Sequence, residues 1–172
     1  MTTNDLSEKK FEIGDKVVHP QHGVGFIEGM EEKQFEPNDA RMYYVVSIPE
    51  TTLWVPVKFS SSGLRKLGSV NEIEECHRVL LAVPETLTAG RDLLSNLSNR
   101  IKLGSLAAHC EVVRDLTAFS RQKPLYGPIA DFQRMALNVL CQEWATVKGI
   151  PQADASQEIN DLLKEGRVTN EL

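Results

Sequence analysis

Short β-branched and aromatic segments, separated by glycine and proline, fill residues 11–57, and this stretch most constrains the fold. Residues 16–19 and 24–30 are separated by a Pro and a Gly, a spacing typical of strand, turn and strand. Two further candidate strands follow at 42–48 and 53–57. The bends of a tightly coiled sheet need residues without a Cβ, and glycines stand at suitable places: Gly14, Gly23, Gly25 and Gly29. The pattern predicts a small barrel of about five short strands.

Helical periodicity replaces this pattern from about residue 69 onward. Ser69 and Glu72 have the spacing of a capping box, and Pro84 predicts the end of the helix that they begin. Its apolar face is expected to contain Ile73, Cys76, Leu80 and Val83. Further helices are expected from Thr86 or Thr88 to Gly104, from Ser105 to the connector at 122–128, from Pro128 to Gly149, and over about 153–165.

Gly104 is expected to end the second of these helices with a positive φ. The fold class predicted from the whole chain is α+β: a small β-barrel at residues 11–68, followed by a bundle of about five helices at 69–172. Residues 1–10 lack the apolar segment of a secretory signal and are expected to be a disordered lead.

Charge and cysteine content exclude several classes of protein. A net charge of −5 and a pI near 5.4 argue against coating of nucleic acid by bulk electrostatics. Three Cys without framework spacing argue against a disulfide scaffold, and no apolar run approaches the roughly 18 residues that span a bilayer. The expected setting is the reducing cytoplasm, without a membrane.

Catalytic and metal-binding motifs are weak. The glycines between Gly23 and Gly29 lack the spacing of a phosphate loop and open a strand rather than a helix. Cys76-His77 and His109-Cys110 resemble two halves of a zinc site, but neighbouring helical residues point about 100° apart. His19 and His22 flank a proline turn, without other ligands at metal spacing. We therefore predict no enzymatic activity, no metal and no cofactor, and a small metal-dependent hydrolase is kept as a remote alternative.

The segment 91–123 is more basic than the rest of the chain. It holds six Lys or Arg against three Asp or Glu, a balance of +3 within a chain of −5. A solvated helical face and a set of contacts to DNA phosphates explain this balance equally well.

One long motif begins at Phe11 and reads Phe-x-Ile-Gly-Asp-Lys-Val-Val-His-Pro-x-His-Gly-Val-Gly-x-Ile-Glu. Tyr43 to Val46, Val55 to Val57 and Gly63 to Lys66 follow in order, and Glu111 to Leu116 lies in the third expected helix. In these motifs the chain resembles the bacterial CarD-like transcription regulators over about residues 11–165. A related β-module occurs in the transcription-repair coupling factor, a much larger motor protein, and the helical tail favours the free-standing regulator.

The resemblance implies a Tudor-like or SH3-like β-domain that docks on the β subunit of RNA polymerase by adding a strand edge to it. The residues that correspond to this role are Lys33, Tyr43, Tyr44, Leu53 and Trp54. Trp54 precedes Val-Pro next to a strand edge, where a large aromatic side chain is a plausible hot spot of binding. The alternative position for Trp54 is in the core of the barrel.

The resemblance also implies that the helical domain touches promoter DNA at the upstream edge of the bubble, independently of sequence. Family members place a Trp wedge shortly before the second helix of this domain, but this chain has no Trp between residues 55 and 143. Alignment from Pro84 puts Leu87 in that place, whereas alignment from Gly104 puts Gly90 there. A Leu can act as a weaker wedge and a Gly cannot. The DNA contacts implied are Leu87, Arg91, Arg100, Lys102 and Arg114.

The sequence thus predicts a cytoplasmic, non-enzymatic regulator, with a monomer favoured, that binds polymerase and stabilises or destabilises the open complex. The first alternative is an adaptor of the same fold, whose helical domain recruits another protein without a DNA wedge.

Overall fold

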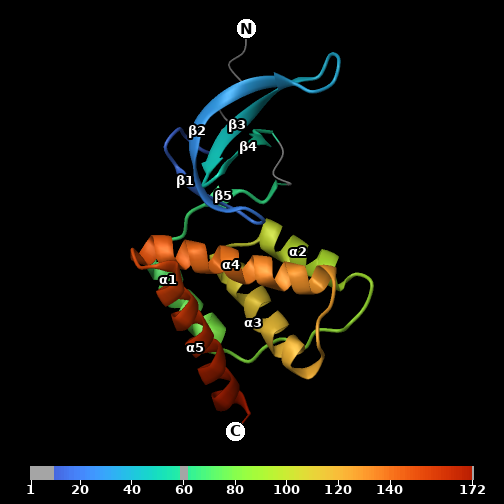
Figure 1. The fold of residues 1–172 in the computed structure, drawn as a ribbon, viewed down its shortest axis with the longest axis vertical. Helices are drawn as coiled ribbons and strands as arrows, with labels where there is room; N and C mark the ends of the chain where they lie inside the picture. Colours follow the sequence, from blue (N-terminus) through green and yellow to red (C-terminus); the bar gives the residue numbers. More distant parts are fainter. Residues whose placement is uncertain (1–9, 59–61, 172) are drawn as a thin grey trace. The chain divides into compact units, whose positions relative to one another are not determined.

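The computed structural model describes residues 10–58 and 62–171. The chain divides into two compact units, Met1–Leu67 and Gly68–Leu172, called here the β unit and the helical unit. The described residues form five strands followed by five helices (Figure 1), so the predicted α+β fold class is confirmed. Of the expected lead at 1–10, residues 1–9 lie outside the described residues.

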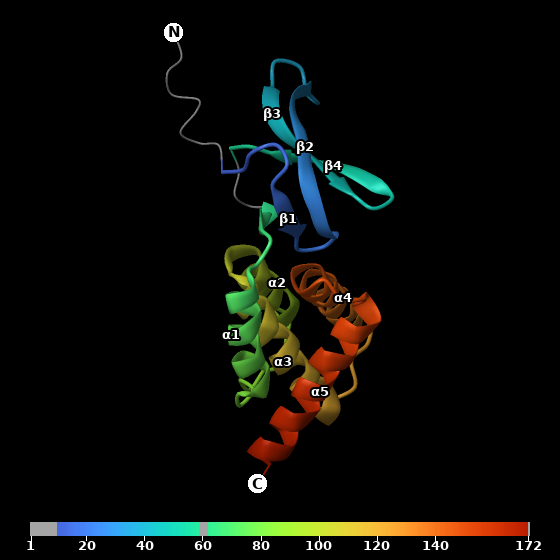
Figure 2. The same cartoon turned by 90° about the vertical axis from the view of Figure 1, so that its left-hand side faces the viewer.

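The β unit is one antiparallel sheet with strand order β4-β3-β2-β1-β5. The longest strands, β2 and β3, form a hairpin that extends past their shorter neighbours (Figure 2). In the described residues no hydrogen-bonded pairing joins the end strands β4 and β5, so the sheet is not closed into a hydrogen-bonded barrel. The strand bounds are β1 Lys16–His19, β2 Gly23–Gln34, β3 Ala40–Ile48, β4 Thr51–Pro56 and β5 Arg65–Lys66.

Strict alternation along β3 separates the two faces of this sheet. Tyr44, Val46 and Ile48 point into the core of the β unit, whereas Tyr43 and Ser47 are half-buried on the other face. The Tyr44 ring packs edge-on against Phe11 with a centroid distance of 5.4 Å. The Tyr44 hydroxyl also accepts the Phe11 N–H at 3.3 Å, so this tyrosine ties the start of the described chain to the sheet.

The helical unit contains α1 to α5, and several helix ends have the predicted signals. Ser69 and Glu72 form both hydrogen bonds of a capping box, and Ser105 caps α3 through the Ala108 N–H. Gly149 ends α4, as predicted, and it lies in the left-handed region with φ of +67°. The helix bounds are α1 Val70–Leu81, α2 Leu93–Leu103, α3 Leu106–Gln122, α4 Pro128–Lys148 and α5 Gln152–Asn170.

Three expectations for the helical unit were wrong. The second helix begins at Leu93 and not near 86–88, because the Glu85 N–H donates to Asp115 in place of a helical partner and Gly90 disfavours helix. Val83 is 69% exposed and not part of the α1 face. Gly104 has φ of −101°, so it is not left-handed. A glycine is required there by space, since a Cβ would lie 2.4 Å from the Ala108 Cβ.

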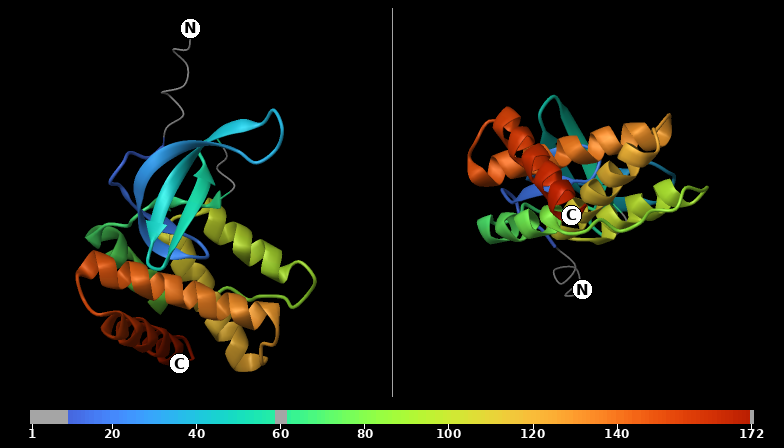
Figure 3. Two further views of the ribbon diagram at one scale, coloured as in Figure 1. Left: turned by 45° about the horizontal axis from the view of Figure 1, so that its top comes forward. Right: turned by 90° about the horizontal axis from the view of Figure 1, so that it is seen from below.

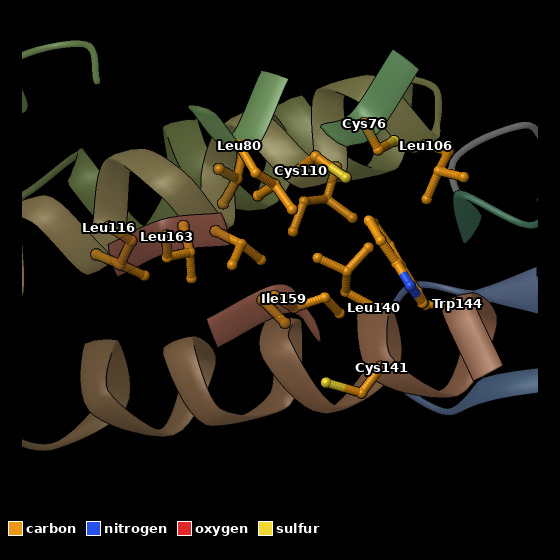
Figure 4. Close-up of a cluster of buried hydrophobic side chains, with 14 of the residues drawn as sticks. Cys76, Leu80, Leu106, Cys110, Leu116, Leu140, Cys141, Trp144, Ile159 and Leu163 are labelled. Atoms are coloured by element: carbon orange, nitrogen blue, oxygen red, sulfur yellow. The ribbon is translucent and has the colours of Figure 1, made fainter. Parts of the chain in front are cut away.

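The core of the helical unit gathers side chains from all five helices. Figure 4 shows part of this core, with Trp144 of α4 among its labelled side chains. Trp144 is fully buried, and its Nε1 donates to Glu158 Oε2 at 2.8 Å. The His77 ring stacks on its indole at 5.0 Å. Cys76, Cys110 and Cys141 are buried inside the unit, where they fill space as small apolar residues.

Glu158 also accepts from Lys148 Nζ at 2.6 Å, and the Lys148 and Trp144 hydrogen bonds lower the pKa of this carboxyl below 4.5. Because the pKa of Glu158 is lower in the folded state than in the unfolded state, these hydrogen bonds stabilise the fold above the ordinary pKa of a glutamate. This stabilisation is lost as the pH falls through the folded-state pKa. Glu158→Gln is expected to cost about 0.5–1 kcal/mol of unfolding free energy at pH 7, since the group is partly exposed and screened. Urea unfolding should show that wild type and Glu158→Gln differ less in unfolding free energy at pH 3 than at pH 7. An equal difference at both pH values would contradict the lowered pKa of Glu158.

The boundary between the units falls at one peptide bond. The Leu67 N–H donates to Lys16 O in β1 at 3.0 Å. The next amide, that of Gly68, donates to the buried Glu143 Oε1 of α4, also at 3.0 Å. Each unit therefore holds its own end of the connection by a hydrogen bond of its own.

Candidate functional site

Trp54 of β4 is held in a fixed position on the surface of the β unit. Its side chain is 43% exposed, and its indole Nε1 donates to Glu31 Oε2 of β2 at 3.0 Å. Lys33 Nζ lies 4.7 Å from the centre of the indole ring and 3.3 Å from the same Glu31 oxygen. The hydrogen bond from Trp54, followed by the one from Lys33, lowers the pKa of Glu31. The alternative that Trp54 belongs to the barrel core was wrong.

The main chain next to Trp54 forms an edge of the sheet. Strand β4 pairs with β3 on one side, and the Val57 N–H donates to Met42 O at 3.0 Å. Peptide groups alternate along an antiparallel strand, so Thr52 and Trp54 direct their N–H and C=O groups away from β3. Pro56 follows without an N–H, as is usual on an edge strand. This edge therefore offers a short hydrogen-bonding ladder beside an exposed aromatic ring.

Tyr43 shares the Trp54 face, and Phe35 extends it. Tyr43 pairs with Glu31 across the β2–β3 ladder, and Phe35, 68% exposed, packs edge-on against the Tyr43 ring at 5.4 Å. Phe35 was not predicted, although a single aromatic residue in the polar run at 31–40 is the signal that could have found it. We define the docking face as Glu31, Lys33, Phe35, Tyr43 and Trp54.

Two of the predicted docking residues lie elsewhere. Tyr44 is only 2% exposed and belongs to the core of the β unit. Leu53 is partly buried and packs against that core. The structure therefore brings together Lys33, Tyr43 and Trp54, and it separates Tyr44 and Leu53 from them because side chains alternate along each strand.

In the helical unit, Asp115 of α3 is a fully buried carboxylate with three partners. Its Oδ1 accepts the Glu85 N–H at 2.9 Å and Arg114 Nε at 2.8 Å, and its Oδ2 accepts Arg100 Nη2 at 3.0 Å. Arg114 Nη1 also donates to Val79 O at the end of α1. This cluster fastens the segment that leads from α1 to α2 onto α3, because a buried charge is stable only when it is paired.

Arg100 and Arg114 were expected to face DNA, but both direct their guanidinium groups at the protein's own carboxylates. The Arg114 side chain is 12% exposed, and that of Arg100 is 29% exposed, with Glu111 Oε2 at 3.6 Å in addition to Asp115. Both residues neutralise Asp115 within the fold. A count of charges along the sequence could not reveal this, since the partners lie on different elements.

The remaining predicted DNA contacts differ in accessibility. Arg91 is exposed and Lys102 half-buried, and neither forms an ion pair within the described part of the chain. Leu87 packs against the helical core and lines a groove of about 340 Å³ with Leu80 and Phe119, among others, so it is not a free wedge. Gly90 is exposed, and a Cβ there would meet no atom within 4 Å.

Comparison with known families agrees with this division into two units. Residues 11–68 match the CarD-like/TRCF RID domain, and residues 94–160 match the CarD C-terminal domain. The chain belongs to the CarD family. It is also similar to a Bacillus subtilis (strain 168) protein named "Putative transcription factor YdeB", with 30% identity over 146 residues, which is 83% of this chain and 95% of that relative.

Membership of the CarD family makes the protein a non-enzymatic transcription regulator, as the sequence predicted. Among the described residues, no group of three His, Cys, Asp or Glu side chains could hold a metal ion. His19 and His22 lie 4.8 Å apart by ring centre in the β unit, and His109 is buried in the other unit with Nε2 donating to Ala136 O at 2.7 Å. No described helix has both the length and the apolar character to cross a bilayer.

Proposed function

We propose that this CarD-family protein acts in the cytoplasm by docking on the β subunit of RNA polymerase through its docking face and the edge of β4. The observation that carries the proposal is the exposed Trp54 ring held between Glu31 and Lys33 beside that edge. A rigid aromatic side chain loses little entropy when a partner covers it. The outward peptide groups of Thr52 and Trp54 can pair with a strand of the partner, as in strand-addition complexes.

The second half of the proposal is that the helical unit modulates the stability of the promoter open complex by sequence-independent DNA contact near the upstream edge of the bubble. The exposed Arg91 and the half-buried Lys102 are available for phosphates. With a net charge of −5, the protein would bind DNA weakly alone, and the polymerase would supply its local concentration.

The experiment combines purified RNA polymerase, a promoter fragment and the full chain, and it measures binding to polymerase and the lifetime of open complexes after a competitor is added. Polymerase binding together with a changed lifetime supports both halves of the proposal. Binding with an unchanged lifetime favours the adaptor, in which the helical unit recruits another protein. Absence of polymerase binding contradicts the docking proposal.

Gly90→Trp is expected to lengthen the open-complex lifetime. The position is exposed and surrounded by open space, and its φ is outside the left-handed region, so a large side chain fits. An aromatic side chain that stacks at an opened duplex end contributes about 1–2 kcal/mol, which corresponds to roughly 5- to 30-fold in lifetime. Gly90→Ala is the matched control and should leave the lifetime unchanged. Equal lifetimes for the two variants would place Gly90 away from the DNA.

A further inference from the structure

The outer half of β2 has a hydrogen-bonded neighbour on one side only. Strand β1 pairs with β2 over residues 23–26, and the Ile27 N–H donates to Asp15 O at 2.9 Å, whereas β3 pairs with β2 as far as Gln34. In the left view of Figure 3, β2 curves out toward the hairpin with β3 on one side and no described strand on the other. Residues 28–34 therefore form a second edge of the sheet, called here the β2 edge, which is separate from the edge of β4.

The pairing of β3 determines which peptide groups of the β2 edge point outward. Met42 O accepts a hydrogen bond from the end of β4, so by alternation Tyr43 directs its peptide groups at Glu31 of β2. The alternate residues of β2 direct their N–H and C=O groups away from β3: Met30, Glu32 and Gln34. None of these groups has a hydrogen-bond partner among the described residues. This ladder is longer than the one offered by β4, and an unpaired edge is a template for another strand.

Two carboxylates without ion pairs give the β2 edge a negative charge. Glu28 lies at the irregularity between Ile27 and Gly29, and both Glu28 and Glu32 are exposed. Within the part of the chain that the structure describes, neither forms a salt bridge. The cations of the β2–β3 hairpin are already engaged, since Lys33 and Arg41 each pair with another carboxylate of the hairpin. The charge of this edge is therefore complementary to that of a basic partner.

A second copy of this chain is a poor occupant of the β2 edge. When two such edges pair antiparallel, the register that joins all the outward peptide groups is centred on Glu32. Glu32 of one copy then lies directly opposite Glu32 of the other, and like charges in that position destabilise a pair of strands. The same carboxylate attracts a lysine or arginine of a different chain.

We propose that the β2 edge binds an extended basic segment of a partner protein, which adds a strand to the sheet. The segment carries a lysine or arginine opposite Glu32 and an apolar residue opposite Met30, which is half-buried on the same face of the strand. Main-chain hydrogen bonds supply affinity, and the side chains select the partner. This inference does not rest on the proposed function, because polymerase docking uses the edge of β4 and the opposite face of the sheet.

The test follows the backbone amides of the isotope-labelled full chain by NMR. The chain is titrated with a capped peptide of about seven residues, in which lysine alternates with threonine or valine. The shifted amides should be those of Met30, Glu32 and Gln34. A matched peptide with glutamate in place of lysine should bind about tenfold more weakly, and Glu32→Lys should reverse this preference. Glu74→Lys makes the same change of charge at an exposed residue of α1, and it should bind the peptides as the wild type does.

Three results overturn this inference: shifts at the amides of Thr52 and Trp54 instead, equal affinity for the two peptides, or no binding at peptide concentrations up to about 1 mM. A wild-type dimer in sedimentation that Glu32→Pro dissociates also overturns it, because a second copy then fills the edge. Polymerase binding is measured separately, and Glu32→Lys should keep the wild-type affinity. A wild-type chain that binds the lysine peptide but not polymerase contradicts the proposed function and leaves this inference intact.

Discussion

Asp115→Ala is expected to lower the free energy of unfolding by about 3–5 kcal/mol, the cost of leaving a buried charge unpaired. Asp115 is fully buried and the Arg114 side chain is 12% exposed, so the variant leaves Arg114 Nε without its carboxylate acceptor. The variant also orphans the Glu85 N–H that fastens the segment before α2. Denaturant unfolding of the full chain measures the loss.

Asp131→Ala is the matched control for Asp115→Ala. Asp131 also pairs with an arginine, Arg134, but both side chains are largely exposed. Exposed pairs contribute about 0–1 kcal/mol, so this variant should unfold almost as the wild type does. Similar losses for the two variants would show that the Asp115 cluster does not hold the helical unit together.

Trp54→Ala is expected to weaken binding to RNA polymerase by about 2 kcal/mol, or roughly 30-fold in Kd, as for a buried aromatic residue of an interface. Its ring is 43% exposed in the free protein, so the fold should keep its stability and the loss should appear in binding. Titration of purified polymerase with the full chain measures the change.

Two further variants are compared with Trp54→Ala in the same titration. Lys33→Ala removes a charge at the rim and should have a smaller effect that depends on salt. Tyr126→Ala removes an aromatic ring that is more exposed but lies in the other unit, and polymerase affinity should not change. Equal affinity of Trp54→Ala and the wild type would remove the docking face from the proposal.

Local signals in the sequence were sufficient for most elements of the fold. Three such signals are the capping box at Ser69, the proline at the start of α4 and Gly149 at the end of α4. Each acts through the backbone within a few residues, so it can be read without a structure. The alternation of β3 likewise assigns Tyr44 to the core beside Val46, and it should have removed Tyr44 from the predicted docking residues.

The candidate site was less predictable because its decisive contacts join distant parts of the chain. Glu85 and Asp115 are 30 residues apart, and Arg100 and Asp115 are 15 apart. Such contacts determine whether an arginine is available to DNA. They cannot be read from the residue type of the arginine or from the charge balance of the segment around it. Trp54 was predicted as a surface contact from the resemblance, but its hydrogen bond to Glu31, 23 residues away, required the sheet register.

Two hydrogen bonds at the boundary between the units determine where the chain can be joined to that of a relative. The Leu67 N–H donates to Lys16 O within the β unit, and the Gly68 N–H donates to Glu143 within the helical unit. A chimera that joins the β unit of this protein to the helical unit of a relative can be spliced at the single peptide bond between them. Such a splice keeps both anchoring hydrogen bonds, provided that the relative retains a carboxylate at the position of Glu143. Exchange at this bond would assign differences between family members to one half of the protein or the other.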